Sequence, residues 1–255
     1  MTYSAQQWLR VCSSIDIWIF TIILCGVFPI AGYMLFRNLK NPAKQNRKSR
    51  KLRTYISIMG LEWAFVAALI WISHRHSLSP EELGEKLVNV KFTAIITTIL
   101  LAVFAVMVYF NIRQLRQMKP EKLETELSKL KMFLPGNKAE SFIFFLIAIT
   151  AGICEELLYR GWLQNLFIYT TGYVWIGLIS GAVIFGIGHV YQGKMGMIQT
   201  GIIGLIFGAV FIFTGSLIAG QILHTAIDAV NGIVGYYALS LLKFRSQETA
   251  DKNVT

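Results

Sequence analysis

Charged residues are scarce in this sequence, and they almost disappear from its second half. Asp, Glu, Lys and Arg make up 15% of the 255 residues, well below the roughly 25% that is usual in soluble domains. Hydrophobic residues make up 55%, and the mean hydropathy is +0.54. This composition excludes an ordinary soluble domain and predicts a helical protein that crosses the membrane several times.

Cysteine is sparse as well, and acidic residues are missing from one long loop. Cys12, Cys25 and Cys154 follow no spacing that is typical of disulfide frameworks or metal sites, so we interpret them as small buried packing residues. Residues 37–53 contain eight basic residues and no acidic one. The positive-inside rule therefore places this loop in the cytoplasm.

The formal net charge of +10 gathers in such loops. Topology and anionic lipid headgroups explain a positive charge distributed in this way. We therefore expect membrane lipid as a partner, and we expect no nucleic acid.

The predicted fold class is all-α, a polytopic transmembrane helical bundle of about seven spans. Each span is an apolar segment bounded by polar or charged residues. The expected spans are residues 15–36, 55–73, 92–110, 141–167, 174–189, 197–213 and 217–242.

An additional, amphipathic helix is expected between the third and fourth spans. Leucines recur there at helical spacing after Pro120, which suits the first turn of a helix. They are Leu123, Leu127, Leu130 and Leu134. Because this loop is again rich in basic residues, we predict that the helix lies on the cytoplasmic membrane surface.

We divide the chain into three parts. Residues 1–140 hold three transmembrane helices with basic cytoplasmic loops, and residues 141–242 form a four-helix core that carries the motifs. Glycines four residues apart, such as Gly204 and Gly208, indicate close helix packing in this core. Residues 243–255 form a polar C-terminal tail that we expect to be disordered.

Two adjacent carboxylates stand inside the fourth predicted span, where an unpaired charge is costly. Residues four apart share a helical face, so Glu156 and Arg160 are predicted to form an ion pair. Glu155 is turned about a hundred degrees away and has no local partner. We therefore interpret Glu156 and Arg160 as structural and Glu155 as available for chemistry.

The predicted spans contain only two histidines. His189 ends the fifth span, four residues after Phe185, and His224 lies in the seventh. Asp228 and Asn231 follow His224 at helical spacing and share its face. A lone histidine in a span is usually a packing residue. Two histidines with three carboxylates in a charge-poor region instead indicate a functional site.

Two kinds of chemistry suit these residues. A carboxylate with a histidine can bind and deprotonate water for amide hydrolysis, while side chains of another helix stabilise the oxyanion. Glutamate and histidine are also plausible zinc ligands. Zinc held by Glu155, His189 and His224 therefore stays open as an alternative, although the sequence contains no HExxH-type pair.

The order of the motifs resembles the CPBP family, the CAAX-protease and bacteriocin-processing group of intramembrane glutamate endopeptidases, also called the Abi family. The motifs are Glu155-Glu156-x-x-x-Arg160, Phe185-x-x-x-His189 and His224-x-x-x-Asp228. Each motif alone is a weak signal, but three in this order within apolar segments are specific. The resemblance covers about residues 141–237.

The resemblance implies that Glu155 and His189 activate a water molecule. It also implies that His224 and residue 228 form the oxyanion site. Residue 228 is Asp228 here, where an asparagine would donate a hydrogen bond directly, and an ionised aspartate only accepts. Either Asp228 is protonated or it orients His224, with Asn231 as an assisting residue.

The resemblance further implies structural roles for Glu156 and Arg160, and a supporting position for Phe185. Members of the family are considered metal-independent, so we expect no cofactor.

We predict a CAAX-type membrane endopeptidase, a hydrolase that cuts a membrane-associated protein or peptide. The expected location is a bacterial cell membrane. One alternative is a non-catalytic scaffold or bacteriocin-immunity protein of the same family. Another is an ion-coupled transporter, which predicts an inverted repeat that we do not find.

The predicted topology contains one conflict. A straight fourth span that enters from the cytoplasm places Glu155 about 21 Å beyond Ser141 at 1.5 Å per residue. His189 ends a span that returns and would then lie near the inner face. Either the fourth helix starts before Ser141, or the fourth and fifth spans are short, tilted or broken around a water-filled cavity.

Overall fold

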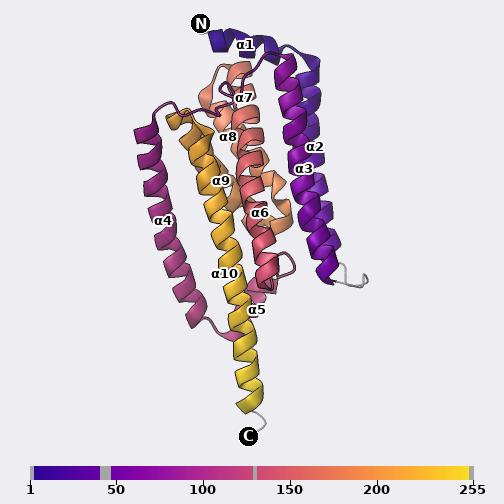
Figure 1. The fold of residues 1–255 in the computed structure, drawn as a ribbon, viewed down its shortest axis with the longest axis vertical. Helices are drawn as coiled ribbons and strands as arrows, with labels where there is room; N and C mark the ends of the chain where they lie inside the picture. The colour runs from indigo at the N-terminus through magenta and orange to yellow at the C-terminus, as the bar shows by residue number, and fades with distance from the viewer. Residues whose placement is uncertain (1–2, 41–46, 129–130, 253–255) are drawn as a thin grey trace.

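The computed structural model describes residues 3–40, 47–128 and 131–252, and all regular structure among them is helical (Figure 1). Six helical segments of the described chain are long and apolar enough to cross a membrane, and Val174–Gly188 is a shorter apolar helix. The predicted all-α, multi-pass bundle is confirmed. The difference lies in the fifth expected span, which is too short to cross by itself.

The first part of the chain forms α1 to α4, with α2 and α3 packed together as a pair. Their bounds are Tyr3–Cys12 (α1), Ile15–Lys40 (α2), Arg47–Arg75 (α3) and Val90–Gln117 (α4). Residues 41–46 of the predicted basic loop lie outside the described residues. Helix α4 stands at the edge of the bundle in Figure 1, where it contacts α10 and, less extensively, α9.

The predicted amphipathic helix exists as α5, but it is shorter and more buried than expected. It spans Pro120–Ser128, so Leu134 lies beyond its end, and Leu130 is outside the described residues. Leu123 is fully buried and packs in a cluster with Ala238 and Leu242 of α10. Helix α5 is therefore docked on the bundle through its apolar face as well as being placed beside the basic loops.

The second part of the chain contains the motif-bearing helices. Their bounds are Lys138–Glu155 (α6), Glu156–Gln164 (η1), Asn165–Thr171 (α7), Val174–Gly188 (α8), Val190–Gln192 (η2), Gly193–Thr214 (α9) and Leu217–Lys252 (α10). The element η1 is a π-helix and η2 a short 3-10 helix. π-Helical turns are rare and frequently occur at functional sites. Regular α-helical spacing had not predicted this one.

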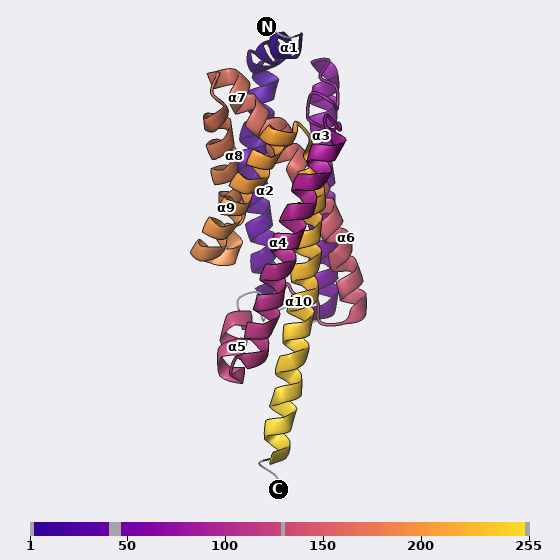
Figure 2. The ribbon, with the colours of Figure 1, turned by 90° about the vertical axis from the view of Figure 1, so that its left-hand side faces the viewer.

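The conflict over depth is resolved by the short helix α8. Sixteen residues separate Glu155 from Thr171 at the end of α7, and fifteen separate His189 from Val174 at the start of α8. At about 1.5 Å per residue these distances are about 24 Å and about 22 Å. Glu155 and His189 are therefore level, because the α8–α9 hairpin turns back well above the lower end of α10 (Figure 2).

The C-terminal tail differs from its prediction. Helix α10 continues through Lys252, so residues 243–252 are helical and not disordered, while residues 253–255 lie outside the described part of the chain. The tail continues the helix because no glycine or proline follows Leu242 to end it. Arg245 also donates hydrogen bonds to the carbonyls of Arg116 and Met118 at the end of α4.

One hydrophobic core joins the two parts of the chain. Trp8 of α1, Phe20 of α2 and Trp162 of η1 belong to the same buried cluster. Cys154 is fully buried in it, as predicted, whereas Cys12 and Cys25 are only partly buried beside it. The division near residue 140 stays a prediction, and the N-terminal helices directly support the π-helix that follows Glu155.

Candidate active site

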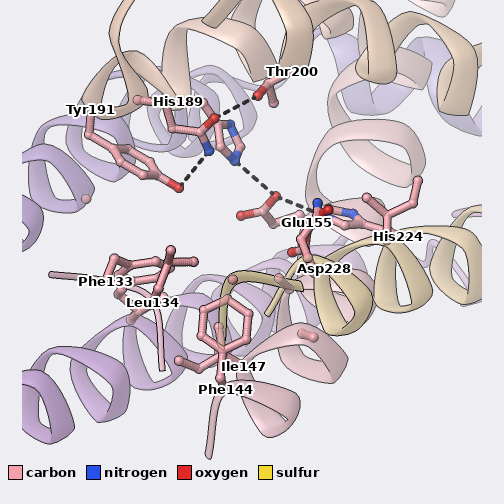
Figure 3. Close-up of a pocket in the computed structure, with 18 of the residues that line it drawn as sticks. Phe133, Leu134, Phe144, Ile147, Glu155, His189, Tyr191, Thr200, His224 and Asp228 are labelled. Atoms are coloured by element: carbon pink, nitrogen blue, oxygen red, sulfur yellow. Dashed lines mark hydrogen bonds and ion pairs between the residues drawn. The ribbon is translucent and has the colours of Figure 1, made fainter. Parts of the chain in front are cut away.

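A cavity of about 480 Å³ opens between α3, α6, α10 and the end of α8. Its ionisable lining groups gather at one end, where Glu155, His189, His224 and Asp228 point toward one another (Figure 3). Aromatic and aliphatic side chains form the other end. Those labelled in Figure 3 are Phe133, Leu134, Phe144 and Ile147.

Glu155 is the carboxylate that faces this cavity. It is the last residue of α6, its residue exposure is 6%, and its Oε2 has no hydrogen-bond partner. Oε2 lies 4.0 Å from Nε2 of His189 and 3.8 Å from Nε2 of His224. Three separate helices thus bring one unpaired carboxylate oxygen and two imidazole nitrogens together.

His189 is oriented by the end of its own helix. Its Nδ1 lies 2.9 Å from the carbonyl oxygen of Phe185. A carbonyl only accepts hydrogen bonds, so Nδ1 carries the proton in this contact. The other nitrogen, Nε2, then presents a lone pair to Glu155 when the ring is neutral.

Glu156 faces away from the cavity opening; its Oε1 has two partners, whereas its Oε2 is buried without one. Its Oε1 accepts a hydrogen bond of 2.9 Å from Arg160 Nη1 and lies 2.9 Å from His224 Nδ1. The predicted ion pair is therefore present within the π-helix. The contact to His224 was not predicted, because spacing along one helix says nothing about a partner on α10.

Arg160 has further partners that explain its burial. Its Nη2 donates to the carbonyl of Gly204 at 3.3 Å, and its guanidinium carbon lies 4.1 Å from the centre of the Phe185 ring. Gln164 donates in the same way to the carbonyl of Gly208. The predicted close-packing glycines thus admit polar side chains of η1 to the backbone of α9.

Phe185 packs against both histidines. Its ring centre lies 4.8 Å from that of His189 and 5.9 Å from that of His224. Only 1% of this residue is exposed. Rotation of either imidazole would therefore require Phe185 to move.

Asp228 and Asn231 line the cavity from α10. Asp228 Oδ2 lies 3.6 Å from His224 Nε2, which is longer than a good hydrogen bond. His224 Nε2 therefore faces two carboxylates, from Glu155 and Asp228, while its Nδ1 is held by Glu156.

Several cavity residues had not been singled out from the sequence. Gln192 follows His189 in η2 and contacts Tyr191 at 3.3 Å and Thr200 at 3.4 Å. Glu62 of α3 also lines the cavity. It is the single acidic residue within the second predicted span, and that isolation was a usable signal.

Among the described residues, no group of three or more His, Cys, Asp or Glu side chains is arranged as a metal-ion site. Oε2 of Glu155 lies 4.0 Å from Nε2 of His189 and 3.8 Å from Nε2 of His224, somewhat wider than the spacing of about 3.4 Å between two ligands that each lie about 2.1 Å from one tetrahedral zinc ion.

The fold defines an integral membrane protein whose helical bundle encloses a cluster of carboxyl and imidazole groups. Residues 137–230 match the family model described as Type II CAAX prenyl endopeptidase Rce1-like. The matched segment contains all three motifs and confirms the resemblance to the CPBP family of CAAX proteases. It points to a protease, and therefore to a hydrolase. No curated protein and no solved structure matches the chain.

Proposed function

We propose that the protein is an intramembrane endopeptidase that hydrolyses a peptide bond in a membrane-associated protein or peptide. The observation that carries this proposal is the unpaired Oε2 of Glu155, which faces Nε2 of His189 and Nε2 of His224 inside one cavity. The family match supports the same reaction class. The expected location remains a bacterial cell membrane.

The nucleophile in this proposal is a water molecule held between Glu155 and His189. Both facing atoms accept hydrogen bonds, since Nδ1 of His189 donates to a backbone carbonyl. A water that donates one hydrogen to each atom spans their 4.0 Å separation with an angle of roughly 90° at bonds of about 2.8 Å. Its lone pairs then point into the cavity, toward a bound substrate.

The reaction follows from this arrangement. The water oxygen attacks the carbonyl carbon of the scissile bond while its proton passes to the Glu155–His189 pair. The carbonyl oxygen becomes an oxyanion in the tetrahedral intermediate. When the carbon–nitrogen bond breaks, the same proton is delivered to the leaving nitrogen. The products are a carboxylic acid, which keeps the second proton of the water, and an amine; the acid then loses that proton to the amine or to solvent.

His224 is placed to stabilise the oxyanion. Its Nδ1 is held by Glu156, and the carboxylates around the ring favour a proton on Nε2 as well. Nε2 then donates a hydrogen bond into the cavity. Asp228 lies beside this nitrogen and orients it, or donates in its protonated form, with Asn231 one turn further along α10.

The zinc alternative has its own test. The proposed mechanism uses the side chains of Glu155, His189 and His224 without a metal ion. Purified protein is therefore expected to keep its activity after treatment with a strong zinc chelator, measured together with metal content. Loss of activity that stoichiometric zinc restores would instead support zinc held by these residues.

The proposed function is tested by comparing peptide termini in cells that carry the natural protein or Glu155→Gln at matched expression. Specific new termini of membrane or secreted proteins should disappear in Glu155→Gln and remain in the control Glu81→Gln, which removes the same charge from an exposed loop position. If deletion of the protein has a phenotype but Glu155→Gln changes no terminus, the scaffold or immunity alternative takes the place of the peptidase.

A further inference from the structure

The cavity is acidic although the protein as a whole is basic. Its lining includes the carboxylates of Glu62, Glu155 and Asp228 and the two imidazoles, and no lysine or arginine lines it among the described residues. The formal charge of the chain is +10. Arg160 lies behind the lining and is paired with Glu156. The cavity lining therefore holds three carboxyl groups and two imidazoles, and no permanently charged cation, among the described residues.

Glu62 is the carboxylate with the least explanation in the cavity. Its residue exposure is 2%, and its Oε2 is buried without a hydrogen-bond partner. Burying a carboxylate without a donor or a countercharge is costly. The Oε2 atoms of Glu155 and Glu156 are also without a hydrogen-bond partner. Glu156 nevertheless pairs through Oε1 with Arg160 and His224, and Glu155 faces two imidazoles, whereas no ion pair to a described side chain is found for Glu62.

The register of α3 against α6 places Glu62 close to the proposed reaction centre. Lys51 pairs with Glu140 at 2.7 Å, and the rings of Tyr55 and Phe144 lie 6.0 Å apart. Both contacts join residues 89 positions apart in the sequence. The same register brings Glu62 opposite Ala151, one helical turn before Glu155 along α6.

The walls near Glu62 suit a long side chain with an apolar stem. Ile58 and Leu61 precede Glu62 on the cavity face of α3, and Phe28 of α2 lines the same cavity. Lysine and arginine place their methylene groups along such surfaces and present the charged group at the end. A carboxylate at the end of an apolar wall is the complement of this shape and charge.

We propose that Glu62 anchors a substrate subsite that binds a basic side chain, lysine or arginine, of the membrane-associated peptide close to its scissile bond. This inference rests on the proposed peptidase function and names a feature of its substrate. The incoming cation supplies the missing donor and the countercharge for Glu62. Among the described residues, no carboxylate lines the apolar side of the cavity near Phe133 and Phe144 that could take the same substrate group.

The test measures binding, so that it does not depend on cleavage. The probes are two fluorescent peptides of leucine and alanine, identical except for one central residue that is lysine or the uncharged norleucine. Their affinities for the full-length protein in lipid nanodiscs are compared by fluorescence polarisation. The natural protein is expected to bind the lysine peptide about tenfold more tightly, a difference of about 1.4 kcal/mol.

Variants then assign this preference to Glu62. Glu62→Gln should remove the difference between the two peptides, Glu62→Asp should retain part of it, and the control Glu81→Gln should leave it unchanged. Equal binding of both peptides by the natural protein would overturn the proposal without any variant. So would a lysine preference that survives Glu62→Gln with the protein folded.

Cleavage of the two peptides separates this inference from the proposed function. A lysine preference in binding that Glu62→Gln removes, with no hydrolysis of either peptide, supports the subsite and contradicts the peptidase. If Glu62→Gln instead slows hydrolysis of both peptides equally and leaves their relative binding unchanged, Glu62 acts on the reaction itself and the subsite is wrong.

Discussion

Two adjacent glutamates occupy opposite surroundings in this bundle. Glu156 is held by Arg160 and His224 on the packed side of the π-helix, and each of these contacts is 2.9 Å long. Glu155 faces the cavity, where its nearest imidazole nitrogens lie 3.8 Å and 4.0 Å away. Residue type and depth in the bundle are therefore not enough to assign a role to a glutamate. The number of direct contacts to other side chains distinguishes the structural Glu156 from Glu155, which is proposed to act in catalysis.

Among substitutions that leave both glutamates in place, His189→Ala is expected to have the largest effect on activity. The substitution removes the proposed proton acceptor beside Glu155. We expect kcat/KM to fall by about 10²–10⁴-fold, with little change in thermal stability, because the ring bonds only to its own helix. Turnover and melting temperature are measured on the same preparation, and a loss of activity only in proportion to unfolding would contradict the assignment.

Glu156→Ala tests the glutamate on the packed side of the π-helix and is expected to lower the stability of the protein. It leaves Arg160 buried without its carboxylate, and breaking such a pair costs about 3–5 kcal/mol. Denaturant unfolding in detergent measures the change. The double variant Glu156→Gln with Arg160→Met should recover much of the loss, because it removes the orphaned charge. A single variant as stable as the natural protein would show that the pair is dispensable.

Asp228→Asn is expected to have a smaller effect on activity, since it removes a charge and keeps a group of the same shape beside His224. An amide both accepts and donates, so kcat/KM is expected to stay within about tenfold of the natural value. Asp228→Ala should lose more activity than Asp228→Asn. A hundredfold or larger loss in Asp228→Asn would mean that the negative charge itself is needed.

The smallest expected effect is on stability, for a substitution of Glu85, a glutamate in a loop outside the membrane. Burial raises the pKa of its carboxyl, and a hydrogen bond from Gln221 at 2.5 Å lowers it in part. Because the pKa of Glu85 is higher in the folded protein, folding favours its protonated form. The contribution of Glu85 to stability is therefore fully present below the ordinary glutamate pKa of about 4.3 and is lost as pH rises through the folded-state pKa.

Glu85→Gln cannot ionise, so its melting temperature should exceed that of the natural protein at pH 7 and match it at pH 4. The exposed control Glu81→Gln should show no such gain. An equal shift for Glu85→Gln at both pH values would point to a packing effect and not to ionisation.

The sequence predicted the features that depend on composition and on short spacing. Charge scarcity predicted the helical spans, and the interval of four residues predicted the Glu156–Arg160 pair, which the structure contains. The order of the motifs predicted a resemblance to the CPBP family, which the match over residues 137–230 confirms. The catalytic roles of Glu155, His189, His224 and Asp228 remain predictions, although the fold brings these residues together.

Other features depend on contacts between distant segments and were missed. Apolarity over residues 174–189 indicated a full span, but α8 ends at Gly188 and the 3-10 turn after His189 sends the chain back before the helix is long enough to span. The π-helix depends on packing around Trp162 and Arg160 that no local pattern specifies. Leu134 matched the helical period of α5, yet it lies in the following loop, where Lys51 Nζ donates to its carbonyl.

The most direct test of the account is one side-by-side measurement of Glu155→Gln and Glu156→Gln in purified protein. Hydrolysis of a peptide substrate and the unfolding free energy are measured for both variants and the natural protein. We expect opposite results for the two variants. Glu155→Gln loses hydrolysis and keeps its stability, while Glu156→Gln loses stability first. Hydrolysis by a folded Glu155→Gln protein at the natural rate would contradict the central claim that Glu155 activates the water.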